Sequence, residues 1–403
     1  MSVPLHPLET TDLIRETYLR YLKTIYPFQA TELRAQFWRA LEQPDLLVKG
    51  PLLEATPPYE TGKSIEEMAA AGVLHPAFRS ISSPALPYER PLYVHQQQVI
   101  EKVIGGRNVV VATGTGSGKT ESFLIPIIDH LLREAEAGTL VQPGVRALLL
   151  YPMNALANDQ MKRLRQVLAG YPHITFGRYI GETPDTRREA ETVFREQFRT
   201  EPPRNELISR EEMQEAPPHL VLTNYAMLEY LLLRPRDTAF FDGETGRHWR
   251  FIVLDEAHVY DGANGIEIAM LLRRVKDRVV RSEKGRLRIM ATSATLGRGR
   301  KDYPQVVRFA SELFGETFEW IDNDPTCQDV VEATRKSLIH QSPAWGEGTP
   351  ALYSDLHSAA LSGESPDKLA HIASISGVPV TVVERAQQAA LSQSGEQSIN
   401  AFL

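Results

Sequence analysis

The run Thr113-Gly-Thr-Gly-Ser-Gly-Lys-Thr120 has the composition of a loop that binds phosphate groups. Closely spaced glycines let the backbone bring several N–H groups inward without Cβ clashes, and a following helix adds the positive end of its dipole. In such a loop a lysine bridges the β- and γ-phosphates of a nucleotide, and a threonine hydroxyl binds Mg²⁺. The sequence therefore predicts ATP and Mg²⁺ as cofactors, bound by Gly114, Thr115, Gly116, Ser117, Gly118, Lys119 and Thr120.

The context of this loop supports the functional interpretation. An apolar run over 108–112 precedes it, and a helical pattern begins at Glu121. A strand, a glycine-rich loop and a helix in that order are what a nucleotide phosphate site requires. Thr113 stands where a glycine is usual, but a chance glycine-rich turn remains the weaker alternative.

A second run, Arg250-Phe-Ile-Val-Leu-Asp-Glu-Ala-His258, places two carboxylates after four apolar residues. Ligands of open α/β sheets collect at the carboxyl ends of the strands. At that position Asp255 would bind Mg²⁺, directly or through water, and Glu256 would orient and polarise the attacking water. A solvated strand end usually explains a bare Asp-Glu pair, but a phosphate loop in the same predicted sheet favours the catalytic explanation.

The run Met290-Ala-Thr-Ser-Ala-Thr-Leu296 ends another predicted strand. The hydroxyls of Ser293 and Thr295 would couple His258 to whatever binds nearby. This run carries little information alone, and its place after the other two gives it weight. We expect Lys119, Asp255, Glu256 and His258 to be catalytic, with Thr120 and Asp255 as the metal ligands.

These loops need a rigid sheet to position them, and six apolar segments are candidate strands. Several are continuous β-branched or leucine runs without polar alternation, which is typical of strands buried on both faces of a parallel sheet. The segments are 108–112, 147–151, 175–179, 219–223, 251–254 and 287–291. The sequence thus predicts an α/β domain over 91–320, with the charged stretch 182–215 as an exposed helical excursion at the edge of the sheet.

The flanking regions differ from this domain. Residues 1–90 predict a small helical accessory domain, with a capping box at Ser64-Ile-Glu-Glu67 and aromatic side chains that we interpret as packing rather than as a partner surface. Residues 321–403 predict a linker at 343–350 and a helical extension. Within it, 369–391 has the spacing of a helix-turn-helix DNA reader, but it is nearly free of basic residues, which favours a simple connector.

The composition excludes several classes of protein. Apolar residues make up 42% of the chain and charged residues 24%, which excludes bulk disorder. Because the net charge is −7, any binding of nucleic acid must come from a local patch of the surface and not from the charge of the whole chain. A single cysteine, Cys327, excludes an intrachain disulfide and a cysteine-built zinc site. With no signal-like start and no membrane-spanning apolar run, we expect a cytoplasmic protein without a membrane partner.

Taken in order, the three motifs resemble those of the first motor domain of superfamily 2 helicases, with the second motif spelled DEAH. Segments 93–96, 151–157, 181–184 and 222–228 resemble the upstream glutamine element and motifs Ia, Ib and Ic of that family. The resemblance covers about 91–315 and extends to the Lhr-like and RecQ-related DNA helicases. It implies a RecA-like P-loop NTPase fold.

The resemblance also implies roles for residues outside the three motifs. Gln96 would read the edge of the adenine. The backbone of one nucleic-acid strand would be contacted by Asn154, Gly181, Thr183, Thr223 and Asn224. Small hydroxyl and amide side chains contact phosphate without reading bases, which predicts sequence-independent binding. Arg178, Arg187 and Arg188 would add charge, although a solvated helix face explains the last two better.

The second motor half that this family requires is not recognisable. The Gln-x-x-Gly-Arg-x-x-Arg pattern is absent, and residues 294–403 show no run of buried strands. An arginine supplied by a second domain is worth on the order of 10³–10⁵ in rate. We therefore expect poor hydrolysis by this chain alone, and a second RecA-like domain as a partner, either in the same longer chain or in trans.

Two classes of function fit these observations. The first is an ATP-dependent helicase or translocase acting on single- or double-stranded DNA, with RNA as a possible substrate because backbone contacts discriminate poorly. Segments 258–269 and 49–57 resemble the opening of very large bacterial helicases, some from phage-defence systems such as Druantia and DISARM, which implies antiviral defence. The second is an ATP-binding regulatory or assembly module that does not unwind nucleic acid.

Overall fold

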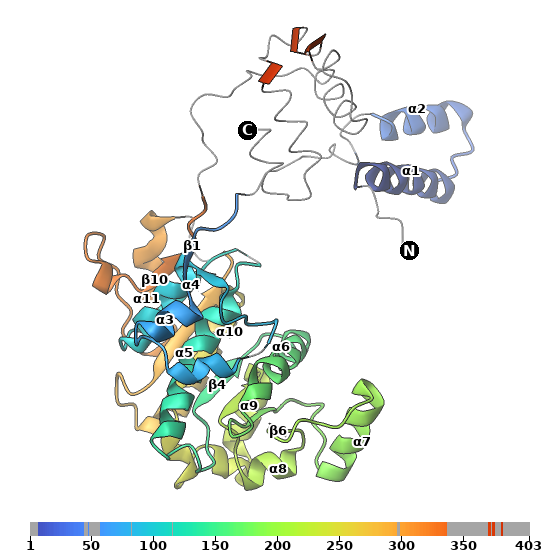
Figure 1. Cartoon of the computed structure of the whole chain (residues 1–403). Coiled ribbons are helices and arrows are strands. Elements are labelled where there is room, and N and C mark those ends of the chain that lie inside the picture. Colours follow the sequence, from blue (N-terminus) through green and yellow to red (C-terminus); the bar gives the residue numbers. More distant parts are fainter. Residues whose placement is uncertain are drawn as a thin grey trace. The chain divides into compact units, whose positions relative to one another are not determined.

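The computed structural model describes residues 7–43, 47, 57–81, 83–114, 116–295 and 299–336, together with 370, 371, 373, 374, 380 and 381. The chain divides into two compact units between Pro57 and Pro58 (Figure 1). Beyond 336, apart from those six residues, the predicted linker and helical extension lie outside the described part. Within the described part, no helix combines the length and the apolar character needed to cross a membrane.

The first unit contains α1 (Pro7–Ile25) and α2 (Thr31–Leu41). Its aromatic side chains pack only in part as the sequence predicts. The Phe37 ring lies edge-on to Tyr26 and Phe28, with ring centroids 5.8 and 5.0 Å apart. Tyr18 and Tyr21 instead stack on each other and stay about half exposed, and α2 buries none of its residues.

The second unit is built on an eight-stranded parallel sheet, in the order β10-β3-β9-β8-β4-β7-β5-β6. The strands are β3 (Val109–Ala112), β4 (Ala147–Leu150), β5 (Phe176–Arg178), β6 (Glu206–Leu207), β7 (Leu220–Thr223), β8 (Phe251–Leu254), β9 (Arg288–Ser293) and β10 (Val330–Glu332). All six predicted strands are present, and the predicted α/β fold is confirmed.

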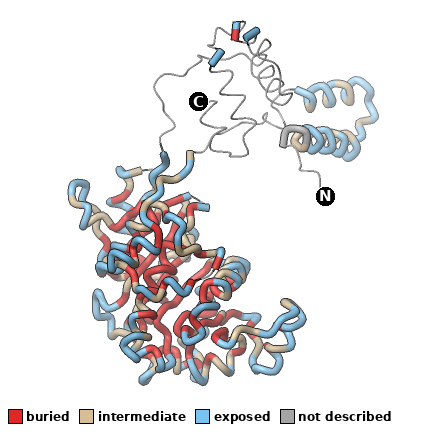
Figure 2. The backbone as a smooth tube through the Cα atoms, in the orientation of Figure 1, coloured by how far each residue is buried: buried red, intermediate tan, exposed pale blue. Residues whose placement is uncertain are grey.

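Helices cover both faces of this sheet, and Figure 2 shows the buried residues gathered at the centre of the unit. The α-helices are α3 (Ile65–Ala70), α4 (Val94–Ile104), α5 (Lys119–Glu136), α6 (Asn154–Val167), α7 (Arg187–Phe198), α8 (Arg210–Glu215), α9 (Tyr225–Leu233), α10 (Gly262–Val280) and α11 (Tyr303–Phe314). Successive residues of β3 point to opposite faces. Val109 and Val111 join the core under α4, α5 and α6, whereas Val110 joins the core under α9, α10 and α11.

The structure draws both domain boundaries differently from the sequence prediction. Residues 58–90 belong to the second unit, because β1 (Thr61–Ser64) pairs with β2 (Pro91–Tyr93) and Met68 and Phe78 are fully buried in its core. The predicted capping box at Ser64 is present and opens α3. At the other boundary, β10 extends the sheet into the region predicted as linker and helix.

The pH dependence of stability has an identifiable source in His219, which is buried directly before β7 and accepts a hydrogen bond from the Thr175 N–H at 3.0 Å. Burial, followed by the charge of Arg146, lowers the pKa of His219 from 6.5 to about 4. Between these values the unfolded chain binds a proton that the folded chain does not. This stabilising contribution is complete above pH 6.5 and is lost as the pH falls toward 4.

We expect His219→Asn, which keeps an acceptor toward Thr175, to reduce the acid sensitivity of the fold. Between about pH 7 and about pH 4.5, the unfolding free energy of the variant is expected to fall by roughly 2 kcal/mol less than that of the wild type. Urea unfolding at the two pH values measures this difference. An identical loss in the variant and the wild type would contradict the assignment.

Candidate nucleotide site

The glycine-rich loop joins β3 to α5, as the sequence predicts, and α5 begins at Lys119. Gly116 and Gly118 have φ angles of +74° and +73°, a conformation that a side chain rarely adopts. A Cβ on Gly118 would also clash with the Nε2 atom of Gln96. Around Gly116 a Cβ would meet no atom within 4 Å, so the loop is open there. Thr115 lies outside the described residues.

Gln96 supports this loop from behind. Its Nε2 atom donates to the Gly118 carbonyl at 2.9 Å, and its Oε1 atom accepts from the Tyr93 N–H at 2.8 Å. The side chain is only 2% exposed. In this structure both ends of the Gln96 amide are therefore hydrogen-bonded to backbone groups, and the side chain stabilises the loop.

Two further side chains fix the loop at Ser117, which is fully buried. The hydroxyls of Thr113 and Ser117 lie 2.6 Å apart and share a hydrogen bond across the loop. Thr113 stands at the position where a glycine was expected. The Nε2 atom of His95 donates to the Ser117 carbonyl at 2.9 Å. Burial lowers the pKa of His95, which favours the neutral imidazole that this donation uses. Sequence reasoning missed His95, although it precedes Gln96 directly.

The two predicted motifs meet across the sheet. The Nζ atom of Lys119 lies 3.1 Å from the Oε1 atom of Glu256, and the lysine side chain is 10% exposed. The order β3-β9-β8 explains this contact, because parallel strands bring their carboxyl ends to one edge. Glu256 has a φ of +50°, a conformation that costs energy for a residue with a side chain and that clusters at functional sites.

Asp255 is held by a residue that sequence reasoning did not single out. The Thr292 hydroxyl donates to the Asp255 Oδ1 atom, and the same hydroxyl accepts from the Glu256 N–H at 3.2 Å. Burial raises the pKa of the Asp255 carboxyl, while the Thr292 hydrogen bond acts in the opposite direction. A partly buried carboxylate oxygen near hydroxyl groups matches the oxygen ligands that Mg²⁺ prefers.

His258 and Ser293 lie together, as expected. The Ser293 hydroxyl is 3.2 Å from the His258 Nδ1 atom, and that atom is 3.4 Å from the Oε2 atom of Glu256. The Thr295 backbone N–H donates to the Ser293 hydroxyl at 3.2 Å, and its side chain is exposed, so the coupling role expected for its hydroxyl stays a prediction. Lys119 and His258 thus approach the two different carboxylate oxygens of Glu256, and the oxygen that faces His258 makes no hydrogen bond in the described structure.

Thr120 is connected to α6. The Nε2 atom of Gln160 donates to the Thr120 hydroxyl at 3.3 Å, and Arg163, one turn later, forms an ion pair with Glu121. Helix α6 begins at Asn154, one of the positions expected to contact nucleic acid. A single helix therefore joins the phosphate loop to that second region.

The five positions expected to contact nucleic acid fall into two groups. The Asn224 side chain donates to Asn154 at 2.9 Å, and Asn154 donates to the exposed Glu182 at 3.3 Å, beside Gly181, which is also exposed. We call Asn154, Gly181 and Asn224 the track. Asn224 also caps α9 by accepting from the Met227 N–H.

Thr183 and Thr223 are buried and turn their hydroxyls inward. Thr183 donates to the Arg178 carbonyl at 2.8 Å, and Thr223 donates to the Tyr179 carbonyl at 2.6 Å. They are 4% and 0% exposed, respectively. In this structure these hydroxyls shape the loops behind the track and do not present a free donor to solvent.

Comparison with known proteins is consistent with this geometry. The family model described as DEAD/DEAH box helicase matches residues 93–303, more than half of the chain. The Druantia protein DruE of Escherichia coli (strain UMEA 4076-1) is 31% identical over 82% of this chain and 22% of its own length. The ATP-dependent helicase Lhr-Core of Methanothermobacter thermautotrophicus is 29% identical over 45% of this chain and 19% of its own.

Among solved structures, the DUF1998 helicase MrfA bound to DNA has a TM-score of 0.47 and 23% identity, over 69% of this chain and 29% of that chain. The chain spans about a fifth of the length of the two curated relatives named above.

Proposed function

Because the chain belongs to the DEAD/DEAH box helicase family of superfamily 2, we propose that it is the first, RecA-like motor domain of an ATP-dependent DNA helicase or translocase. The contact of 3.1 Å between Lys119 and Glu256 supports the proposal most directly, because it brings together the two motifs that would form the NTPase site. ATP–Mg²⁺ supplies the phosphoanhydride bond whose hydrolysis drives such a motor.

Each residue of the site has a role suited to its surroundings. The amides of the loop at 113–120 would surround the phosphates, where the bend at Gly116 leaves space. Thr120 and Asp255 would bind Mg²⁺. Lys119 would leave Glu256 for the phosphates, and the released carboxylate of Glu256 would orient the attacking water. His258 and Ser293 would couple a change in the position of Glu256 to the neighbouring strand end.

The track would bind one strand of DNA through its sugar–phosphate backbone. Asn154 and Asn224 present amide groups beside the exposed backbone of Gly181, and such groups contact phosphate without reading bases. Helix α6 gives this binding a path to the ATP site, since Gln160 contacts Thr120. A path of this kind favours a motor over a purely structural module. Similarity to the Druantia protein favours a role in anti-phage defence.

Steady-state ATP hydrolysis tests the proposal. The chain is assayed alone and as part of a polypeptide that carries a second RecA-like domain, with and without single-stranded DNA or RNA of equal length. We expect DNA to stimulate hydrolysis at least about tenfold, and only when the second domain is present. Hydrolysis that neither nucleic acid stimulates would favour the alternative, an ATP-binding regulatory or assembly module. Stronger stimulation by RNA would replace DNA by RNA as the substrate.

A further inference from the structure

A cavity of about 120 Å³ lies at the edge of the sheet opposite the nucleotide site. Arg250, directly before β8, and Arg288, the first residue of β9, line it from the sheet. Helices α4 and α5 form the other walls. The carboxylates of the nucleotide site, Asp255 and Glu256, follow the opposite end of β8. A ligand bound in this cavity would therefore not compete with the nucleotide.

The two arginines lie on neighbouring strands without a carboxylate between them. Phe251 of β8 pairs with Arg288 of β9, and the Arg288 backbone N–H donates to the Arg250 carbonyl at 2.7 Å. Within the described part of the chain, neither guanidinium forms an ion pair. That of Arg250 donates to the Arg286 carbonyl at 3.2 Å, and that of Arg288 donates to the Gly285 carbonyl at 2.6 Å. Two like charges held close together repel each other and favour an anion beside them.

Arg288 is only partly in contact with water. Its Nε atom is buried and has no hydrogen-bond partner in the described structure. The guanidinium lies against the backbone at the end of α4, where a Cβ on Gly106 would come within 3.2 Å of its Nη2 atom. Burial, followed by the charge of Arg250, lowers the pKa of Arg288, and the Glu316 carboxylate acts in the opposite direction. Glu316 already forms an ion pair with Lys276 at 2.6 Å, so it does not neutralise the arginine.

The other charged groups that line the cavity are paired. The Nε atom of Arg133 lies 2.7 Å from a carboxylate oxygen of Asp129. The Nε2 atom of His130 lies 3.4 Å from a carboxylate oxygen of Glu134. These carboxylates compensate their partners, so the uncompensated positive charge at the cavity belongs to Arg250 and Arg288.

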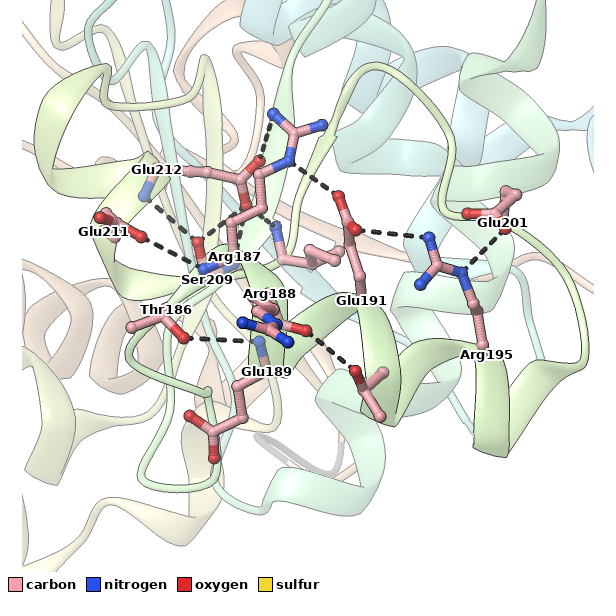
Figure 3. A network of polar contacts seen from close by, with 12 residues as sticks. Thr186, Arg187, Arg188, Glu189, Glu191, Arg195, Glu201, Ser209, Glu211 and Glu212 are labelled. Carbon is pink, nitrogen blue, oxygen red and sulfur yellow. Dashed lines mark hydrogen bonds and ion pairs between the residues drawn. The ribbon is translucent and has the colours of Figure 1, made fainter.

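Paired arginines elsewhere on the second unit provide the contrast. On α7, Figure 3 shows that Arg187 and Arg195 both reach Glu191. Close to the cavity, the exposed Arg286 lies 3.6 Å from Glu283. Each of these cations has its own carboxylate within reach, which the two arginines of the cavity do not.

The size and charge of the cavity suit a small oxyanion. Guanidinium groups bind the oxygens of phosphate and carboxylate, often through two parallel hydrogen bonds. A phosphate group carries a charge of about −1.5 to −2 at pH 7, which matches two unpaired arginines. The volume of about 120 Å³ is well below the range of about 300–1,000 Å³ for sites that enclose drug-sized ligands. The cavity therefore fits a phosphate group and not a whole nucleotide.

We propose that this cavity binds one phosphate group through the guanidinium groups of Arg250 and Arg288. Free inorganic phosphate and a phosphate monoester on a larger molecule present the same oxyanion, and the experiment separates these two sources. The inference is independent of the proposed function, since neither arginine belongs to the nucleotide site or to the track. It assigns a ligand to two cations that the ATPase chemistry does not use.

Isothermal titration calorimetry with inorganic phosphate, in a chloride buffer of constant ionic strength, tests the proposal. A saturating non-hydrolysable ATP analogue and Mg²⁺ are present throughout, because phosphate also suits the loop at 113–120. We expect Arg250→Gln and Arg288→Gln each to weaken phosphate binding at least about tenfold, the effect of losing hydrogen bonds to a charged group. Arg286→Gln is the matched control, because this arginine pairs with Glu283, and it should bind phosphate as the wild type does.

Thermal unfolding separates binding from folding. In chloride, removing one of two neighbouring like charges should leave the melting temperature of Arg288→Gln unchanged or raise it. Phosphate should raise the melting temperature of the wild type and of Arg286→Gln, but not that of the other two variants. If Arg288→Gln does not fold, Arg250→Gln decides the test, because its guanidinium makes a single carbonyl contact at 3.2 Å in the described structure.

Two results would overturn the proposal and leave the proposed function intact. The first is a wild type that does not bind phosphate. The second is equal binding by the wild type and both cavity variants, and a lowered melting temperature of Arg288→Gln would then assign this residue to stabilising the end of α4. A further titration with O-phosphoserine identifies the source of the phosphate. Tighter binding than that of inorganic phosphate indicates a monoester on a larger molecule, and equal or weaker binding indicates the free ion.

Discussion

Replacing Lys119 with alanine is expected to weaken the binding of an ATP analogue by at least about a hundredfold. Hydrogen bonds between charged groups contribute about 1.5–3 kcal/mol each, and a lysine that bridges two phosphates makes more than one. The side chain is 10% exposed and lies 3.1 Å from Glu256, so it is held beside the loop before any nucleotide arrives. Isothermal titration calorimetry in the presence of Mg²⁺ measures the dissociation constant.

The matched control is Lys284→Ala, which removes an exposed lysine between α10 and β9. This variant should bind the analogue as the wild type does. A dissociation constant for Lys119→Ala within about threefold of the wild-type value would show that the loop does not bind phosphate in the manner argued here.

Replacing Glu256 with glutamine is expected to leave nucleotide binding intact and to lower kcat by about 10²–10⁴-fold. The substitution keeps the shape of the side chain and removes the charge that polarises water. The polypeptide used must carry a second RecA-like domain, with single-stranded DNA present, because only that form is expected to hydrolyse ATP rapidly. Phosphate release at saturating ATP gives kcat.

Glu267→Gln is the control for this variant, because Glu267 is an exposed carboxylate on α10 in the same part of the chain. It should hydrolyse ATP at the wild-type rate. If Glu256→Gln retains that rate as well, the water must be activated by another group, and the strained backbone at Glu256 would need a different explanation.

The sheet was predictable from the sequence wherever a strand contributes a run of apolar side chains to both faces. Val109–Ala112 and Phe251–Leu254 are such strands. Strands β6 and β10 could not be predicted in this way, because a strand of two or three residues is too short to show a periodic pattern. They are held by their neighbours, as when Arg107 forms an ion pair with Asp329 beside β10. Tertiary contacts of this kind leave no local signal in the chain.

The site was predictable to the extent that chemistry is carried by residue type and order. Lys119 and Glu256 were expected together and lie together. Thr292 was missed because its role depends on register: Leu254 pairs with Ala291, which places Thr292 opposite Asp255. Thr183 is the converse case. Its type suggests a solvent-facing ligand, but its hydroxyl satisfies a buried backbone carbonyl, which sequence alone does not reveal.

A crystal structure of the chain with Mg²⁺ and a non-hydrolysable ATP analogue is the most direct test of the central claim, that residues 113–120 and 255–258 form one nucleotide site. The account predicts the phosphates within the loop, Lys119 moved from Glu256 to those phosphates, and the metal between Thr120 and Asp255. A nucleotide bound elsewhere, or a loop that keeps the Lys119–Glu256 contact at saturating nucleotide, would contradict it.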